Sequence, residues 1–204
     1  GFDVNYIWYK DGEDLDRLDV LVLPGGYTFG DYVMPGKLAA LSRMGNKIRL
    51  FSEQDKLILG ICNGCQILTH LRLIPGTFIL NKSARFVQRY VYIKVEDDNS
   101  PFTSLFAKGE VIKLDIAHYS GAYYPQEHND SFRVAFRYST ADGEVTEKSN
   151  PQGSFENIAG LLSANGKVLG MMPHPERAVD YLLGSVDGKK LFLSVLNWFE
   201  QRRR

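Results

Sequence analysis

The sequence has few cysteines, no excess of positive charge and no long apolar run. Its two cysteines, Cys62 and Cys65, are too few and too close together for a secreted disulfide framework. Lys plus Arg equals Asp plus Glu at 24 each, so the basic excess typical of nucleic-acid binding is missing. No apolar run reaches the ~20 residues of a membrane span, and no signal-peptide pattern opens the chain. We therefore expect a cytoplasmic protein that binds neither nucleic acid nor membrane.

The length of 204 residues suits one domain with a sizeable core. The chain starts at Gly1 rather than Met and enters a strand-like segment over residues 2–9. We expect either that the natural protein has a preceding segment or that its start has been trimmed.

The first third of the chain alternates strand and helix patterns. Apolar segments at residues 19–23 and 57–61 are each followed by a glycine-containing turn, as in strands buried on both faces. Between them, one apolar helical face is predicted from residues spaced three or four apart, namely Leu38, Leu41, Met44, Ile48 and Phe51. This rhythm predicts an α/β fold with an open, mainly parallel sheet flanked by helices.

The rest of the chain predicts a mixed or antiparallel extension. Strand patterns without long helices between them occupy residues 85–95, 111–116 and 132–138. Ser100-Pro101 predicts a short helix with Ser as its cap. Asn165-Gly166 predicts a two-residue hairpin between apolar segments 158–162 and 168–172. A closing helix is predicted from an apolar face of Phe192, Val195, Leu196 and Phe199.

Cys62 is the first candidate catalytic residue. Residues 60–64 read Gly-Ile-Cys-Asn-Gly, directly after a predicted buried strand and before a helix. Such a sharp turn holds a nucleophile in a strained conformation, with glycines leaving room for the tight backbone. The helix N-terminus favours a thiolate, and the Asn63 N–H can face a developing oxyanion. Two other readings of this segment are a buried structural thiol and, because Cys62 and Cys65 form a C-x-x-C motif, a redox pair.

A second motif favours the nucleophile over the redox pair. Residues 173–176 read Pro-His-Pro-Glu after an apolar strand pattern. A thiol nucleophile needs an imidazole base, and that imidazole needs an acceptor to fix its tautomer. His174 and Glu176 meet this need, whereas a redox protein has no use for them. A zinc site is weaker, because no second C-x-x-C or paired His follows, so we expect no metal.

These residues resemble a known family, the class I glutamine amidotransferases. The resemblance is carried by Pro-Gly-Gly at 24–26, Gly-Ile-Cys-Asn-Gly-Cys-Gln at 60–66 and Pro-His-Pro-Glu at 173–176. Finer features at residues 23–32, 116–118 and 172–179 are similar to the branch of glutaminase subunits that serves purine biosynthesis. The resemblance implies that residues 1–204 form a single amidotransferase domain lacking the family's first strand and helix.

The resemblance also implies a mechanism and roles for individual residues. Cys62 would attack the side-chain amide of glutamine, His174 would transfer protons and Glu176 would hold His174. The oxyanion would be bound by the N–H groups of Asn63 and Gly26, and Gln66 would help to hold the amino-acid end of the substrate. The ammonia would pass to a synthetase subunit that converts formylglycinamide ribonucleotide to formylglycinamidine ribonucleotide.

The chain has no phosphate-binding G-x-x-x-x-G-K-[ST] loop. We therefore expect no cofactor in this chain, and ATP and Mg²⁺ in the partner synthetase subunit, possibly with a small accessory subunit in the complex. Two departures from the family pattern stand out. Tyr-Ser-Gly-Ala at 119–122 replaces the usual Gly-Glu-Gly, and Cys65 stands where an aromatic residue is usual.

Two other functions are compatible with the sequence. The triad would equally serve another amidotransferase or a cysteine hydrolase of similar fold, although residues 27–32 and 177–179 argue against this. A catalytically silent binding subunit is the alternative from a different class. Release of glutamate from glutamine distinguishes the enzyme from the silent subunit.

Overall fold

The computed structural model describes residues 1–10, 14–126 and 133–202. The strands of this part are β1 (Val20–Leu23), β2 (Leu57–Ile61), β3 (Thr77–Ile79), β4 (Val87–Val95), β5 (Val111–His118), β6 (Ala122–Tyr124), β7 (Arg133–Ser139), β8 (Ile158–Leu162) and β9 (Val168–Met171). Its α-helices are α1 (Lys37–Ala40), α2 (Arg43–Ser52), α3 (Asn63–His70) and α4 (Lys189–Arg202).

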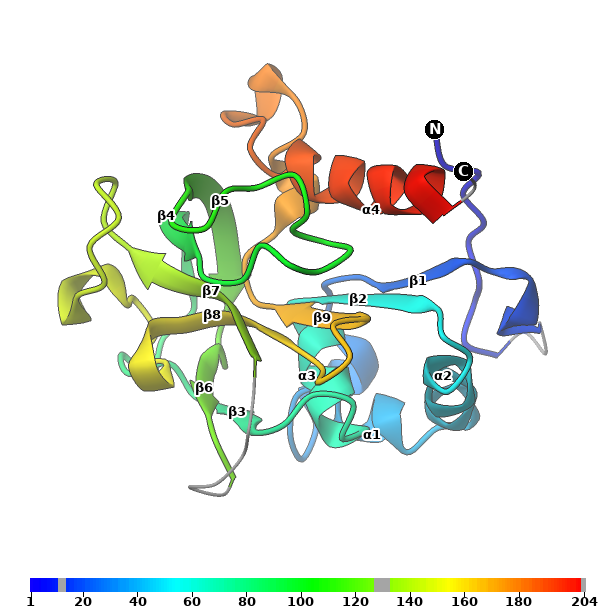
Figure 1. Cartoon of the computed structure of the whole chain (residues 1–204). Coiled ribbons are helices and arrows are strands. Elements are labelled where there is room, and N and C mark those ends of the chain that lie inside the picture. The colour runs from blue at the N-terminus through cyan, green and yellow to red at the C-terminus, as the bar shows by residue number, and fades with distance from the viewer. Residues whose placement is uncertain (11–13, 127–132, 203–204) are drawn as a thin grey trace.

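A seven-stranded sheet in the order β1-β2-β9-β8-β7-β4-β5 forms the centre of the molecule (Figure 1). Strands β1, β2 and β9 pair in parallel, whereas the pairs from β9 through to β5 are antiparallel. A small second sheet pairs β3 with β6. The predicted α/β fold is confirmed, with its parallel part and its antiparallel extension joined in one sheet.

Helices cover both faces of the parallel part of the sheet. Figure 1 shows α4 on one side of β1 and β2, with α1, α2 and α3 on the other. All five residues of β2 are buried, as expected for a strand between two helical layers. Phe192 and Phe199 of α4 pack against the core, so the predicted closing helix is confirmed.

The insertion of β9 beside β2 brings two distant parts of the chain together. Ile61 at the end of β2 is in register with Met171 at the end of β9, and the Cys62 N–H donates to the Met171 carbonyl at 2.8 Å. Because both strands run in the same direction, the segments that follow them leave the sheet at the same edge.

The predicted helix over residues 38–51 is wrong in one respect, because the chain forms two helices there. Leu41 is exposed, and Ser42 adopts an extended backbone and caps α2 by accepting a hydrogen bond from the Gly45 N–H at 3.2 Å. A side chain at Gly45 would clash with the carbonyl oxygen of Ala40. The helix is interrupted between α1 and α2 because the two backbones approach closely at Gly45 and Ala40. The spacing of apolar residues does not reveal this interruption.

The strand predicted over residues 2–9 is also wrong, since no strand forms within described residues 1–10. Phe2, Val4 and Tyr6 are exposed there, which shows that strand propensity without a paired neighbour does not make a strand. The short helix predicted at Ser100-Pro101 is a turn instead. The Ser100 hydroxyl lies 2.6 Å from that of Thr103 rather than capping a backbone N–H.

The hairpin predicted at Asn165-Gly166 joins β8 to β9, but its loop is longer than two residues. Ser163 donates its N–H to Val168 at 2.9 Å, and the Asn165 side chain accepts from the Lys167 N–H at 3.1 Å. The strands predicted at 85–95, 111–116 and 132–138 are confirmed as β4, β5 and β7, except that Phe132 lies outside the described residues.

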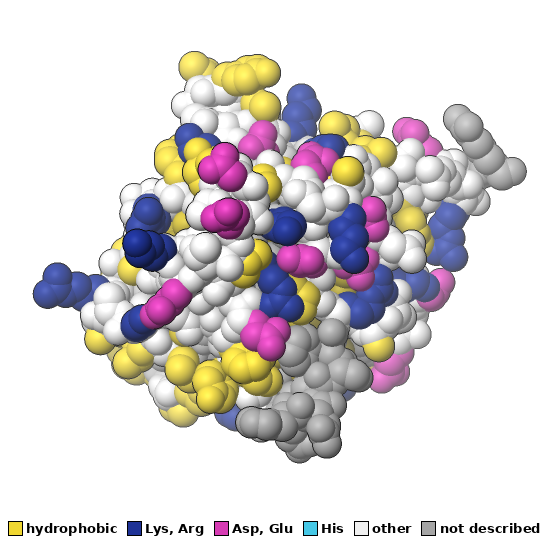
Figure 2. Space-filling model, turned by 60° about the vertical axis from the view of Figure 1, so that its left-hand side comes forward, with side chains coloured by type: hydrophobic (Ala, Val, Ile, Leu, Met, Phe, Trp, Pro, Cys, Tyr) yellow, Lys and Arg dark blue, Asp and Glu magenta, His cyan; other side chains and the backbone are white. Residues whose placement is uncertain are grey.

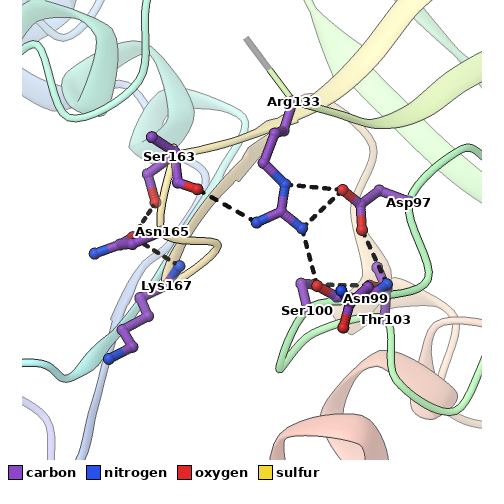
Figure 3. A network of polar contacts seen from close by, with 9 residues as sticks. Asp97, Asn99, Ser100, Thr103, Arg133, Ser163, Asn165 and Lys167 are labelled. Carbon is purple, nitrogen blue, oxygen red and sulfur yellow. Dashed lines mark hydrogen bonds and ion pairs between the residues drawn. The ribbon is translucent and has the colours of Figure 1, made fainter.

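Arg133 at the start of β7 ties this hairpin to a neighbouring loop (Figure 3). Its guanidinium donates to the Asp97 carboxylate at 2.9 Å, to the Asn99 carbonyl at 2.9 Å and to the Ala164 carbonyl at 3.4 Å. The planar fork of arginine suits such divided contacts.

Figure 2 shows acidic and basic side chains interspersed on one face of the molecule, rather than gathered by sign. Within the described residues, no helix combines the length and the apolar character needed to cross a bilayer.

Candidate active site

Cys62 occupies a strained turn between β2 and α3. Its backbone has φ 50° and ψ −107°, a region that residues with a side chain rarely adopt. A side chain at Gly64 would clash with the Leu23 carbonyl, and one at Gly60 would lie 2.8 Å from the Gly64 carbonyl oxygen. The strained turn predicted from the two glycines is therefore confirmed.

His174 follows β9 and is held from two sides. Its N–H donates to the Asp115 carbonyl at 2.8 Å, and its Nδ1 lies 2.6 Å from Oε1 of Glu176. The side chain is 2% exposed, and its Nε2 has no hydrogen-bond partner in the described part of the chain. Since Nδ1 is engaged by the carboxylate, Nε2 is the nitrogen left to exchange a proton with a reacting group.

Gly25, in the turn after β1, shows how close Cys62 and His174 lie. A methyl group placed on Gly25 would be 2.7 Å from Cε1 of His174 and 3.4 Å from Cβ of Cys62. Both side chains therefore border the same small space, which a glycine leaves open. The structure thus brings the predicted base and the predicted nucleophile to one place.

Burial dominates the electrostatics of the Cys62 thiol. It raises the pKa from 9.0 to about 11, against the opposing effect of the Asn63 N–H, which faces the sulfur and lowers it. The thiol donates a weak hydrogen bond to the Ala117 carbonyl at 3.7 Å. The predicted thiolate-favouring effect of the helix N-terminus is present in the Asn63 N–H, but desolvation of the charged form outweighs it. A base must remove the proton during the reaction.

The two predicted oxyanion-hole residues differ in what the structure shows. The Asn63 N–H is directed at the sulfur, where an oxyanion formed by attack of the thiol would lie close by. A methyl group on Gly26 would meet nothing within 4 Å, so Gly26 borders open space beside the turn. The role of Gly26 stays a prediction.

Gln66, predicted to hold substrate, is 5% exposed, and each of its two polar side-chain atoms has a hydrogen-bond partner. Its Oε1 accepts from Asn63 Nδ2 at 2.9 Å, and its Nε2 donates to the Ser120 carbonyl at 2.6 Å. Its side chain thus links the nucleophile turn, through Asn63, to the 119–122 loop, through Ser120. Its low exposure leaves little of the side chain open to a substrate.

His118 is a second buried histidine near the site. Burial, followed by the charge of nearby His174, lowers its pKa from 6.5 to about 4, so it is neutral at physiological pH. Asn81 Oδ1 lies 3.0 Å from its Nδ1 and also accepts from the Gly121 N–H at 2.9 Å. Asn81 thus fixes the loop in which this sequence departs from the family pattern.

Asp115 and Arg177 complete the surroundings of the base. The Arg177 guanidinium donates to Asp115 Oδ2 at 2.9 Å, and its Nε lies 3.8 Å from Oε1 of Glu176. Sequence reasoning missed Asp115, because an acidic residue inside a strand pattern carries no motif. Arg177 was noted only as part of the family resemblance, without a role.

Comparison with known proteins agrees with this geometry. Residues 2–200 match the family of CobB/CobQ-like glutamine amidotransferase domains. Phosphoribosylformylglycinamidine synthase subunit PurQ of Pyrococcus horikoshii is 44% identical over 98% of this chain and 89% of its own length. The corresponding PurQ of Pseudothermotoga lettingae is 45% identical over 100% of this chain and 87% of its own.

Among solved structures, PurLQS from Thermotoga maritima superposes with a TM-score of 0.84 at 41% identity, covering 92% of this chain and 83% of the matched chain. Sequence and structure thus agree over almost the whole length of the chain, so it belongs to the PurQ-type glutamine amidotransferases.

Proposed function

We propose that this chain hydrolyses glutamine to glutamate and ammonia with Cys62 as nucleophile, His174 as proton carrier and Glu176 as its orienting partner. The observation that carries the proposal is the convergence of Cys62 and His174 on the space beside Gly25, with Nε2 of His174 lacking a partner among the described residues. A neutral thiol next to a buried, oriented imidazole is the arrangement that nucleophilic acyl transfer needs.

In the first half of the reaction, the Cys62 sulfur attacks the side-chain amide carbon while Nε2 of His174 takes the thiol proton. The carbonyl oxygen becomes an oxyanion, which the N–H groups of Asn63 and Gly26 stabilise. His174 then gives its proton to the amide nitrogen, the C–N bond breaks and ammonia leaves, with a γ-glutamyl thioester on Cys62. Because burial raises the thiol pKa to about 11, His174 has to take the proton as the sulfur attacks.

In the second half, His174 accepts a proton from water as the water oxygen attacks the thioester carbonyl. The C–S bond then breaks, the proton returns to the sulfur and glutamate departs. Glu176 stabilises the imidazolium that forms in each half. Arg177, held by Asp115, limits the mobility of the Glu176 carboxylate.

Glutamine binds beside Gln66, whose side chain donates a hydrogen bond to the Ser120 carbonyl in the 119–122 loop. We propose that Gln66 helps to hold the amino-acid end of the substrate. It does so by fixing the position of the 119–122 loop, or by contacting the substrate directly after this loop moves. The single domain binds no cofactor or metal ion of its own.

The ammonia goes to a synthetase subunit that makes formylglycinamidine ribonucleotide from formylglycinamide ribonucleotide in the cytoplasm, with ATP and Mg²⁺ bound by that partner. The names of the PurQ relatives and of the PurLQS structure support this assignment. A small accessory subunit completes the complex.

The test is to incubate the chain with glutamine, with and without its synthetase subunit, and to measure glutamate. Cys62→Ala should abolish glutamine-dependent amidine synthesis by the complex while leaving ammonia-dependent synthesis intact. Cys65→Ala is the matched control and should retain both activities. Loss of glutaminase activity in Cys65→Ala but not in Cys62→Ala would overturn the assignment.

A further inference from the structure

Residues 27–33, the segment that follows the Pro-Gly-Gly turn, form what we call the aromatic loop. Tyr27 is 73% exposed, Tyr32 73% and Val33 81%. Phe29, Asp31 and Val33 all have positive φ values, between 52° and 71°, a region unfavourable for residues with side chains. A loop that presents large apolar groups to solvent on a strained backbone is unusual unless something binds it.

The aromatic loop is tied to the nucleophile turn through one side chain, that of Asn63. Asn63 Oδ1 accepts from the Thr28 hydroxyl at 2.5 Å and from the Thr28 N–H at 3.3 Å. Asn63 Nδ2 donates to Asp31 Oδ1 at 3.1 Å and to Gln66 Oε1 at 2.9 Å. The amide, 1% exposed, thus uses every donor and acceptor it has. Thr28 and Asp31 therefore both contact the residue that directly follows Cys62.

The residues just after the aromatic loop are fixed to the same helix, α3. His70 Nε2 lies 3.1 Å from the Pro35 carbonyl, and a methyl group on Gly36 would lie 2.8 Å from the Ile67 N. The segment therefore lies along α3, attached near both ends, with Tyr32 and Val33 exposed between the attachments. A partner bound to the exposed middle would therefore contact a segment that is attached to α3 on both sides.

We propose that the aromatic loop is a docking surface for the synthetase subunit and that Asp31, through Asn63, transmits docking to the nucleophile turn. Asp31 is a positioning residue in this scheme, since it acts on Cys62 only through its neighbour. The inference rests on the proposed function and adds to it a contact surface and a route of control.

The position of the loop favours the synthetase subunit as its occupant. Ammonia released at Cys62 must enter the partner directly, so the partner has to cover the surface around the nucleophile turn. The aromatic loop borders that turn through Asn63. Within the loop, Phe29 already contacts Tyr9 of the same chain, with ring centroids 5.3 Å apart. Tyr27, Tyr32 and Val33 remain for the partner, and aromatic side chains are enriched in the centres of protein interfaces.

The first experiment measures docking. Tyr32→Ser combined with Val33→Ser should raise the Kd for the synthetase subunit about tenfold or more, in line with the loss of a central aromatic contact. Leu50→Ser, which changes an exposed leucine on α2, is the control and should bind like the wild type. If the double variant binds the synthetase subunit as tightly as the wild type, the proposed docking surface is wrong. The proposal is also wrong if the wild type self-associates and the double variant does not, because the surface then binds a second copy of this chain.

The second experiment measures the coupling. The glutaminase rate is compared with and without the synthetase subunit, and its stimulation by the subunit should fall about tenfold in Asp31→Ala. Asp31→Asn keeps an acceptor for Asn63 and should retain stimulation. Thr28→Val, which removes the hydroxyl contact alone, gives a second variant should Asp31→Ala fail to fold. Equal stimulation of wild type, Asp31→Ala and Thr28→Val overturns the coupling.

The controls separate this inference from the proposed function. If the proposed function is wrong, the wild type releases no glutamate even with the synthetase subunit present. If only the coupling is wrong, the wild type and Asp31→Ala are stimulated alike. Ammonia-dependent amidine synthesis, which does not involve Cys62, should be the same in every mixture and shows that the synthetase subunit is intact in each.

Discussion

The Cys62 thiol shows how burial and a favourable N–H oppose each other at one atom. The helix N-terminus supplies the N–H of Asn63, yet burial raises the pKa from 9.0 to about 11. A protonated resting thiol resists oxidation and alkylation, because the thiolate is the reactive form. The residue therefore becomes nucleophilic only when His174 takes its proton.

Alkylation kinetics test this directly. In a Cys65→Ala background, the rate of inactivation by iodoacetamide should rise through pH 9.0 without levelling off, since the folded pKa lies near 11. Below the pKa, the rate should increase about tenfold per pH unit, as the thiolate fraction does. A plateau near neutral pH would show that the free enzyme already holds a thiolate.

Glu176 contributes through the imidazole it holds. Glu176→Gln replaces the carboxylate 2.6 Å from Nδ1 of His174 by a neutral amide, so the imidazolium is less stabilised and the tautomer less fixed. We expect kcat for glutamine hydrolysis to fall by roughly 10²-fold or more. Glu147→Gln, at an exposed carboxylate paired with Lys82, is the control and should keep the wild-type rate. Equal rates for both variants would contradict the role of Glu176.

At the scale of elements, the packing of α3 against β1 depends on a single glycine. A side chain at Gly64 would clash with the Leu23 carbonyl, and neither backbone can yield easily. Gly64→Ala should lower the free energy of unfolding by about 1–3 kcal/mol, the usual cost of overpacking, measurable by denaturant titration. Gly26→Ala, where the new methyl meets nothing within 4 Å, should leave stability nearly unchanged. Equal stability of the two variants would refute the close-packing argument.

The Arg133 fork is the second element-scale contact (Figure 3). Arg133→Lys keeps the charge but cannot reach Asp97, Asn99 and Ala164 together. Because the arginine is partly exposed, we expect a loss of only about 1 kcal/mol, seen as a lower Tm. Arg89→Lys, at an exposed position on β4, should leave Tm unchanged. A Tm for Arg133→Lys equal to the wild type would show that the fork adds no stability.

Sequence patterns predicted elements well where burial alone decides them. The continuous apolar segment of β2 could be read directly, because a strand buried on both faces has no polar position. Sequence patterns gave wrong elements where contacts with distant or neighbouring segments decide whether a helix or strand forms. The break before α2 depends on contact between Gly45 and Ala40, and residues 2–9 found no strand to pair with.

At the scale of the molecule, strand order creates the site. Nothing in the local sequence places β9 beside β2, yet this neighbour relation joins His174 to Cys62. The sequence predicted both residues, and their proximity was inferred from the need of a thiol nucleophile for a nearby imidazole and supported by the family resemblance. The network of Asn63 with Thr28, Asp31 and Gln66 was missed, because side-chain amides linking separate segments leave no sequence pattern.

The central claim is that Cys62, activated by His174, is the residue that bonds to glutamine. The most direct measurement is labelling with a chloroketone analogue of glutamine, followed by peptide mass spectrometry. The account predicts a single adduct on Cys62, blocked by excess glutamine and formed much more slowly in His174→Ala. An adduct on Cys65, or labelling of Cys62 at the same rate without the imidazole, would contradict it.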